Sequence, residues 1–238
     1  MIERVKAGRF SIDVLYEDNH LLAVVKPPNL PVQADSSGDD DLLSIMKRHI
    51  GHKYQKPGNV YLGLVHRLDR PVGGVMVLAR TSKAAARLSA AFAAHEQDKR
   101  YLAVLQGTMT GERTLEDALL KDGRTGTVRV VSPEVPGAKN ARLRTRPLGS
   151  REGLTLSEVT LYTGRAHQIR VQHAHAGFPL WGDARYGGGR PGQQIALWAA
   201  SLGFEHPVRR EPMTFACPPP MIGVWPKFKD VIEERSHA

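Results

Sequence analysis

Short apolar runs separated by polar turns recur along most of the chain, and this spacing is typical of β-strands. Near the start, the apolar runs 12–16 and 21–26 flank a polar turn, and three prolines then force an extended segment. The further apolar runs predict strands at residues 61–65, 75–79, 101–106, 128–131, 141–146, 154–162, 195–199 and 213–216. In the run 154–162 the alternation changes phase, so we expect a β-bulge near Ser157.

Helical patterns are fewer in the first half of the chain. Three aspartates at 39–41 precede apolar residues with helical spacing, so acidic capping predicts a helix that begins near Leu42 and stops at Gly51. Thr81-Ser82 opens an alanine-rich segment of high helix propensity. Two helices are therefore expected before residue 100.

The second half of the chain carries weaker helical signals. Residues 107–126 are rich in glycine, threonine and charge, and are expected to form polar turns and short elements. A short helix is predicted over 166–176, capped by Thr163 and ended by Gly177. A polar helix is predicted near 227–235.

Strands outnumber helices in this reading, and the helices do not alternate regularly with them. The pattern favours an α+β fold with a mixed, largely antiparallel sheet and flanking helices. We expect residues 1–10 to be a short N-terminal extension, 11–226 a single domain, and 227–238 a C-terminal tail with the helical pattern just described.

Charge and cysteine content narrow the choice of function. The chain has 33 Lys and Arg against 24 Asp and Glu, a net charge of +9, and the basic residues are spread along its length. This distribution favours a shaped surface for a polyanion such as nucleic acid. The one cysteine, Cys217, permits no internal disulfide and no cysteine-based zinc site. No apolar run approaches the roughly 18 residues of a membrane helix, and no secretory signal is visible, so a cytoplasmic protein is expected.

The most informative run is His-Arg-Leu-Asp-Arg-Pro-Val-Gly-Gly at 66–74, which lies between two apolar segments. A carboxylate at the end of a rigid strand can be held still and yet reach a ligand, which makes Asp69 a candidate catalytic group. A surface turn in which Asp69 merely pairs with Arg67 or Arg70 explains the same residues. Spacing alone does not decide between the two.

A second polar cluster, at 161–175, places Arg165 and Arg170 around a helix start that follows a glycine. Helix N-termini attract anions. Arg170 could instead hold a buried carboxylate through two parallel hydrogen bonds, and two solvated arginines explain the spacing equally well. His173 and His175 have no third strong ligand at a set spacing, which disfavours zinc.

A third cluster, at 179–188, sets Trp181, Asp183, Arg185 and Tyr186 among glycines. A loop close to a ligand and a packed structural turn are equally compatible with it. The glycines that follow lack the Lys-Ser/Thr pattern of a phosphate-binding loop.

From about Asp13 to Cys217 the chain resembles the RluA-type family of RNA pseudouridine synthases. The resemblance rests on motifs in a fixed order, at residues 18–27, 66–69, 75–84, 99–101, 163–170 and 182–187. The chain departs from the family where Val72-Gly73-Gly74 replaces the usual Thr-Ser-Gly, so a backbone role is expected there. Too few residues precede Asp13 for the RNA-binding S4 module of many relatives, so a catalytic domain alone is expected.

The resemblance implies an isomerase that acts on a uridine of rRNA or tRNA. In the family's reaction the N1–C1′ glycosidic bond breaks, the uracil turns, and the ring rejoins the sugar through C5. The target base must leave its stack to be reached. The resemblance implies no cofactor, and no metal; we also expect a monomer without an obligatory protein partner.

The resemblance also implies roles for three catalytic residues. Asp69 supplies the carboxylate, either by attack on C1′ or by removal of a proton from C2′. Arg170 is the first candidate for the guanidinium that pairs with Asp69, and Arg165 is the second. Tyr101 stacks on the uracil or hydrogen bonds to it, and helps to remove the C5 proton.

Substrate-binding roles follow from the same resemblance. Arg67 fills or braces the space that the flipped base leaves, His66 lies beside it in the motif, and Ile169 packs against the base. The weaker candidates for phosphate contacts are all basic: Lys26, Lys53, Lys56 and Arg80.

Two other classes of protein are compatible with parts of this pattern. One is a non-catalytic RNA-binding domain of the same fold, which turnover on a uridine-containing RNA would distinguish. The other is a glycosidase or nuclease that uses Asp69. A glycosidase normally has two catalytic carboxylates and a nuclease usually has metal-binding acids, and neither set is evident in the sequence.

Overall fold

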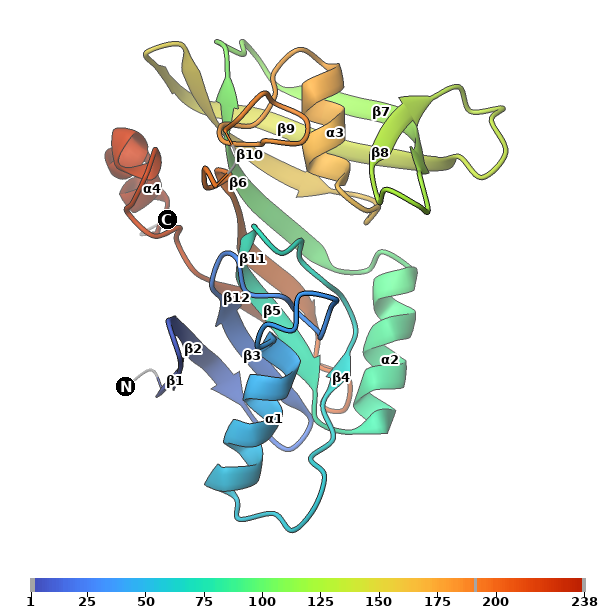
Figure 1. The fold of residues 1–238 in the computed structure, drawn as a ribbon, viewed down its shortest axis with the longest axis vertical. Helices are drawn as coiled ribbons and strands as arrows, with labels where there is room; N and C mark the ends of the chain where they lie inside the picture. Colours follow the sequence, from blue (N-terminus) through green and yellow to red (C-terminus); the bar gives the residue numbers. More distant parts are fainter. Residues whose placement is uncertain (1–2, 191, 237–238) are drawn as a thin grey trace. The chain divides into compact units, whose positions relative to one another are not determined.

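The computed structural model describes residues 3–190 and 192–236. The chain divides into two compact units, each made of two separated segments. The first unit comprises Met1–Asp98 and Ala199–Cys217, and the second comprises Lys99–Trp198 and Pro218–Ala238. The strands and helices of each unit are described in turn below (Figure 1).

The first unit is built on a sheet in which β3 and β5 are central. Its strands are β1 (Glu3–Ala7), β2 (Phe10–Glu17), β3 (Leu21–Lys26), β5 (Gly73–Ala79) and β11 (Leu197–Glu205), in this order across the sheet. Two shorter strands lie off this path: β4 (Gly63–Leu64) pairs with β5, and β12 (Pro212–Ala216) pairs with β11. The pairings β1–β2, β2–β3 and β3–β5 are antiparallel.

Strand β1 lies where the sequence predicted an extension. Glu3–Ala7 pairs antiparallel with β2, with Ala7 opposite Phe10. The turn between them contains Gly8, whose φ of +53° suits glycine. The segment has only short apolar residues between its charged ones, so its sequence gave no strong strand signal, and pairing with β2 makes it a strand.

Both helices of the first unit begin as predicted. In α1 (Leu42–Lys53) the Asp41 side chain accepts a hydrogen bond from the backbone N–H of Ser44 at 3.0 Å. In α2 (Ser82–Ala93) Thr81 caps the helix in the same way. The predicted stop at Gly51 is wrong, because α1 continues through Gly51 to Lys53.

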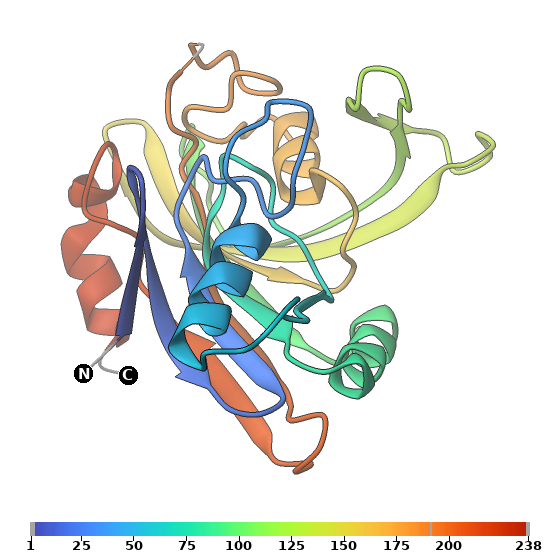
Figure 2. The same ribbon diagram turned by 60° about the horizontal axis from the view of Figure 1, so that its bottom comes forward.

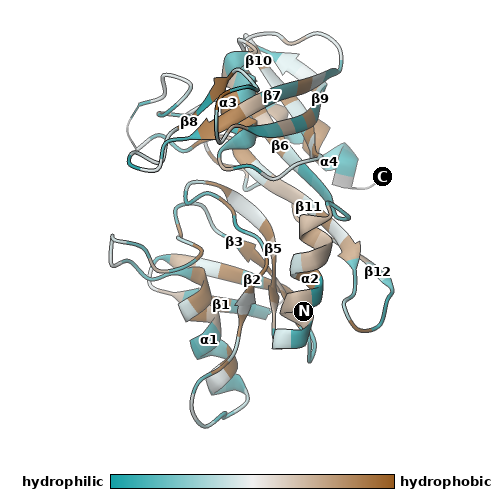
Figure 3. Ribbon diagram, turned by 90° about the vertical axis from the view of Figure 1, so that its right-hand side faces the viewer, coloured by the Kyte–Doolittle hydropathy of each residue, from teal (hydrophilic) through white to brown (hydrophobic). Residues whose placement is uncertain are grey.

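The core of the first unit covers both faces of β5. All seven residues of this strand are buried, which requires packing on each side of the sheet. On one side, Val75 and Val77 pack with Leu88 and Phe92 of α2. In Figures 1 and 2, α1 and α2 flank these strands, and Figure 3 shows β3 and β5 as strongly hydrophobic.

The strands of the second unit pair antiparallel with one another. Its strands follow the order β6 (Asp98–Gln106), β10 (Leu154–Leu161), β9 (Lys139–Arg151), β7 (Arg113–Lys121) and β8 (Val128–Val131). The register of β9 and β10 shifts between Leu156 and Ser157, which confirms the predicted bulge. Strand β7 is the main error of the prediction, because its nine residues lie in the stretch expected to form turns.

The helices of the second unit pack against this sheet. Helix α3 (Gln168–His175) ends before Gly177, which has a φ of +84°, as predicted. Its N-cap is His167 in the left-handed conformation, and not Thr163 as expected. The short helix η1 (Trp225–Phe228) and α4 (Lys229–Ser236) occupy the region predicted as a tail, and Phe228 is fully buried.

These elements form an α+β fold with a largely antiparallel sheet in each unit and a few flanking helices, as the sequence predicted. Within the described part of the chain, no helix is long and apolar enough to cross a membrane.

Candidate functional site

Asp69 lies in the first unit, in the turn between β4 and β5. Burial alternates along the run that leads to it: Leu68 is buried, whereas Arg67 is exposed and Asp69 is partly exposed. The backbone N–H of Val72 donates to the Asp69 carbonyl at 3.0 Å and closes the turn. The Leu68 side chain therefore anchors the turn, while Arg67 and Asp69 keep access to solvent.

The backbone just after Asp69 is fixed by two donors on a distant segment. The Arg70 carbonyl accepts hydrogen bonds from the Asn29 N–H at 2.8 Å and from Lys26 Nζ at 3.0 Å. Asn29 has a φ of +66°, a conformation that asparagine tolerates better than most residues. The Pro-rich segment that follows β3 thus holds the turn that carries Asp69.

Lys26 is a buried cation with a structural role. Its Nζ donates to three carbonyls, those of Pro27 at 3.1 Å, Leu30 at 2.7 Å and Arg70 at 3.0 Å. Burial lowers the pKa of Lys26 to about 7, and the negative charge of Asp69 opposes this effect. Three carbonyl acceptors match the three donors of an ammonium group, so both its hydrogen bonds and Asp69 favour the protonated form.

The phosphate contacts predicted for three basic residues are not supported. Lys26 is fully buried. Lys53 Nζ lies 2.6 Å from Glu3 and 2.7 Å from Glu17, and Arg80 is mostly buried and lies 2.9 Å from Glu17. These cations already have internal partners. Lys56, in contrast, is exposed.

The side chain of Arg70 contacts the loop before α1. Its guanidinium contacts Asp39, lies 3.0 Å from Ser37 Oγ and lies 3.4 Å from Asp35. These ion pairs connect the loop before α1 to the turn that contains Asp69 and Arg70.

The departure from the family at 72–74 has a backbone explanation. Gly74 has a φ of +127°, and a Cβ there would lie 2.3 Å from the Ala199 carbonyl oxygen. Only glycine fits this position, so the chain retains it. Val72 is buried, with 2% of its surface exposed, and fills space in the core where the family usually has a hydroxyl.

His66 supports the edge of β5. Its Nε2 accepts a hydrogen bond from the Val77 backbone N–H at 3.0 Å, and its ring stacks on Phe92 with centroids 5.0 Å apart. The imidazole thus satisfies a strand donor just beyond the end of β4. This structural role differs from the substrate contact predicted for His66, which stays a prediction.

Tyr101 lies in the second unit, in the middle of β6. It is partly exposed and stands opposite Val159, which in turn stands opposite Thr145. Residues opposite each other on paired strands project from the same face. Because Thr145 Oγ1 lies 3.0 Å from Nε2 of His173 on α3, Tyr101 projects from the face that α3 covers.

His173 and its hydrogen bonds belong to the core of the second unit. Its Nδ1 lies 2.7 Å from the Ile169 carbonyl and its Nε2 lies 3.0 Å from Thr145. Burial lowers the pKa of His173 to about 4. The ring is therefore neutral at pH 7, with Nδ1–H donating to the carbonyl.

Arg170 holds a buried carboxylate in the same unit. Its Nε and Nη2 each lie 2.8 Å from an oxygen of Asp183, and Asp183 is 1% exposed. Burial alone would raise the pKa of Asp183, but the hydrogen bonds and charge of Arg170 outweigh it and hold that pKa below its usual value. This confirms the bidentate alternative for Arg170; its predicted pairing with Asp69 stays a prediction.

Asp183 and Tyr186 join the cluster at 179–188 to the start of α3. Backbone N–H groups of Arg185 and Tyr186 donate to Asp183 Oδ1, and Arg170 lies over the Tyr186 ring. The Tyr186 hydroxyl accepts from the Val128 N–H at 2.9 Å and lies 2.7 Å from His167 Nδ1. The cluster is thus a packed structural turn.

The buried Gln168 organises the loop before α3, a role that the sequence reading missed. Its Oε1 accepts from the Thr163 hydroxyl at 2.8 Å and from the Arg165 N–H at 3.0 Å, and its Nε2 donates to the Arg142 carbonyl. A glutamine at a helix start resembles many solvated ones in sequence, so only its burial reveals this role. Arg165 itself is partly exposed and donates to the Asn140 carbonyl.

The predicted residue Ile169 is 4% exposed and sits in the packing of α3, where its predicted contact with a base stays a prediction.

Lys99, which was not predicted as a site residue, lies two positions before Tyr101 on β6, with its Nζ near Gly164 of the loop before α3. Burial lowers the pKa of Lys99 to about 8.

One group of possible metal ligands occurs among the described residues. Glu3, Glu17 and His49 each place one ligand atom within 4.8 Å of the others. Lys53 bonds to both glutamates, so their charges are already compensated. The geometry fits an ion-pair network better than a metal centre.

A family profile and the most similar curated sequences both relate this chain to RNA pseudouridine synthases. The family profile described as RNA pseudouridylate synthase matches residues 20–175, which include Asp69, Tyr101 and Arg170. The chain is 32% identical over 216 residues to ribosomal large subunit pseudouridine synthase D of Zymomonas mobilis, covering 86% of this chain and 68% of that protein. It is 33% identical over 235 residues to the protein of the same name from Pseudomonas aeruginosa, covering 92% and 72%.

A solved structure shares the fold. Human RNA pseudouridylate synthase domain containing 4 aligns with a TM-score of 0.72, covering 94% of this chain and 92% of that chain. At 21% sequence identity, this similarity concerns the fold alone.

Proposed function

Because the chain belongs to the RNA pseudouridylate synthase family of isomerases, we propose that it converts uridine to pseudouridine in ribosomal RNA, with Asp69 as the catalytic carboxylate. The relatives named for the large ribosomal subunit support this substrate class over tRNA. The observation that carries the proposal is the Asp69 turn. Its backbone is held by Lys26 and Asn29, while the carboxylate keeps access to solvent.

Asp69 would act on the sugar of a flipped uridine. Its carboxylate can either attack C1′ or remove the C2′ proton to give a glycal. In each route the N1–C1′ bond breaks, and its electron pair leaves with the uracil. The uracil then turns and C5 bonds to C1′; in the first route this bond replaces the one between Asp69 and C1′, and in the second the proton returns to C2′. Loss of the C5 proton and protonation of N1 complete the product ring.

A fixed backbone around Asp69 matters for this chemistry. A catalytic group displaced by about 1 Å can lose roughly a hundredfold in rate. The contacts of Lys26, Asn29 and Gly74 all act on the turn backbone, and so limit such displacement. Exposed Arg67 would brace the RNA where the target base has left its stack.

Tyr101 would contact the uracil, with its ring against the base and its hydroxyl near C5. Its partial exposure on the α3 face of β6 supports this role. Tyr101→Phe keeps the aromatic face, so RNA affinity should change little. Turnover should fall by about a hundredfold or more if the hydroxyl assists proton removal. If Tyr101→Phe and the parent turn over at the same rate, the hydroxyl has no chemical role and Tyr101 serves only to stack on the base.

Sequencing that maps pseudouridine in total RNA tests the proposal directly. Cells that lack this protein should lose one or more ribosomal RNA sites, and the parent chain should restore them. A chain with Asp69→Asn should bind RNA but restore none. RNA binding by the parent without any change in pseudouridine would favour the alternative, a non-catalytic RNA-binding domain of the same fold. Loss of tRNA sites instead would correct the substrate class.

A further inference from the structure

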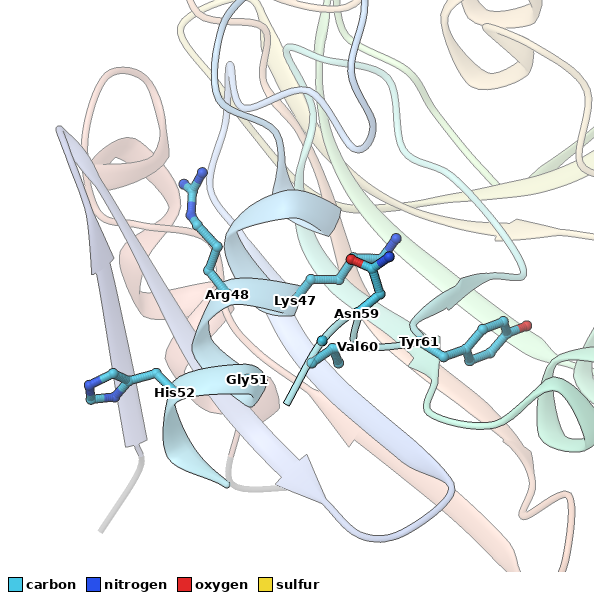
Figure 4. Close-up of a pocket in the computed structure, with 8 residues that line it drawn as sticks. Lys47, Arg48, Gly51, His52, Asn59, Val60 and Tyr61 are labelled. Carbon is cyan, nitrogen blue, oxygen red and sulfur yellow. The ribbon is translucent and has the colours of Figure 1, made fainter. Parts of the chain in front are cut away.

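A hollow of about 710 Å³ lies in the first unit, between the C-terminal half of α1 and the loop that follows it. Lys47, Arg48 and His52 line it from the helix, and Asn59 and Tyr61 line it from the loop (Figure 4). The helix and the loop lie close together at Gly51: a Cβ built on this glycine would lie 3.4 Å from the Val60 side chain. In Figure 4 the Lys47 side chain extends toward the loop that carries Asn59, whereas the His52 side chain extends to the opposite side of the helix.

The charge of the hollow is positive and incompletely compensated. Lys47 is half-buried and forms no ion pair with any residue that the structure describes. Arg48 lies 2.9 Å from Asp40, an exposed pair that solvent screens, and His52 is exposed. Lys53 on the same helix differs, because two glutamates hold it. The hollow is therefore suited to an anion.

An aromatic ring belongs to the same hollow as Lys47 and Arg48. Tyr61 is 49% exposed, and its hydroxyl lies over Gly63, where a Cβ would come within 2.9 Å of it. The small residue at 63 lets the ring lie along the chain with a surface open to solvent. A cationic groove next to an exposed aromatic side chain is the combination that binds single-stranded nucleic acid, the cation at a phosphate and the ring against a base.

The hollow is close in sequence to the Asp69 turn, within the same unit. Tyr61 and Asp69 are eight positions apart (61 to 69), a span of at most roughly 26 Å even if fully extended. A strand of RNA that places a uridine at Asp69 thus has neighbouring nucleotides within reach of the hollow.

We propose that this hollow binds a phosphate and an adjacent base of the single-stranded RNA that flanks the modified uridine. Lys47 would contact the phosphate, Asn59 would hydrogen bond to it or to the sugar, and Tyr61 would stack on the base. The inference rests on the proposed function, since that function supplies the RNA.

Binding of a fluorescent uridine-containing single-stranded RNA tests this inference. The full chain would carry Asp69→Asn to prevent turnover, and the Kd would be measured over a series of salt concentrations. Lys47→Ala should weaken binding about fivefold and reduce the slope of log K against log salt by about 0.7, the value for one single-strand phosphate contact. Tyr61→Ala should weaken binding about fivefold or more with little change in slope, and Tyr61→Phe should restore it.

Lys83→Ala is the matched control, because Lys83 is exposed on α2 in the same unit. Its Kd and salt slope should equal those of the parent, and all variants should melt at similar temperatures. Binding by Lys47→Ala with the parent Kd and slope would overturn the inference. A failure of the proposed function can be told apart from a failure of this inference. In that case the parent chain would bind RNA without converting uridine, and the changes in Kd caused by Lys47→Ala and Tyr61→Ala would still be measurable.

Discussion

Two aspartates, one in each unit, differ in how the protein surrounds them. Asp183 is 1% exposed and receives both Arg170 nitrogens and two backbone N–H groups. Asp69 is partly exposed, and the contacts described around it fix the backbone of its turn. The buried Asp183 carboxylate stabilises the fold through its hydrogen bonds, whereas Asp69 lies on a turn whose backbone is fixed and whose surface is partly exposed. Both aspartates lie in family motifs, so their environment, and not the motif, separates their roles.

The sharpest test of this comparison is the same substitution at both aspartates. Asp69→Asn should lower single-turnover isomerisation to below about one per cent of the parent, since loss of a nucleophile or base costs several powers of ten. Its melting temperature should change little. Asp183→Asn should instead destabilise the protein by roughly 3–5 kcal/mol, because it leaves Arg170 buried without its charge partner.

Single-turnover rates and denaturant unfolding of both variants measure these effects, with Asp40→Asn on the exposed Arg48 pair as a control. Residual activity above about one per cent in Asp69→Asn would contradict its catalytic role. A folded Asp183→Asn of parent stability would contradict the assignment of Asp183 as structural.

Substitution of Arg170 tests the structural role of Asp183. Arg170→Ala should lower the free energy of unfolding by roughly 3–5 kcal/mol, since Asp183 would be left buried and unpaired. Arg170→Lys should recover only part of this, because lysine cannot make the two parallel bonds. Arg165→Ala, which removes the bond to the Asn140 carbonyl, should cost about 1 kcal/mol or less.

The same unfolding measurements address the predicted pairing of Arg170 with Asp69. A loss of turnover in Arg170→Ala that exceeds the loss of folded protein would support that pairing. A loss explained by unfolding alone would assign Arg170 to Asp183 only.

The pH dependence of Arg170→Ala provides a further check with a definite sign. The pKa of Asp183 in the folded parent is lowered, chiefly by Arg170 against the opposing effect of burial. Its pairing therefore stabilises the fold above the pKa of an unfolded aspartate, about 3.9, and this contribution is lost as pH falls further. The difference in unfolding free energy between parent and Arg170→Ala should be largest at neutral pH and should shrink below about pH 4. A difference independent of pH would assign the loss to packing.

Lys26 tests the backbone support of Asp69, with a smaller expected effect. Lys26→Met keeps the length of the side chain but leaves three carbonyls without their donor, and should cost roughly 1–3 kcal/mol of stability. Turnover per folded molecule should fall between about tenfold and a hundredfold as the turn loosens. Lys83→Met, on the exposed face of α2, is the control. A stability loss with unchanged turnover would restrict Lys26 to the fold.

Local patterns determined much of this structure. The alternation in 154–162 predicted the bulge at Leu156–Ser157, and Asp41 and Thr81 marked two helix starts. Each of these features depends on residues only a few positions apart in the chain. A short stretch of sequence is therefore enough to predict it. The ordered motifs also identified the family and the candidate catalytic aspartate.

Long-range pairing decided the rest. Strand β7 has a sequence without strong alternation, and becomes a strand because β8 and β9 take up its backbone hydrogen bonds. Lys26 looked like a surface cation, yet three carbonyls gathered from two segments bury it. Arg170 allowed several partners until the fold brought Asp183 to it. The sequence alone determined which residues could carry charge and chemistry. Burial and partners separated by many residues, which only the tertiary structure supplies, decided which of those charges are bonded inside the fold, as at Lys26 and Asp183.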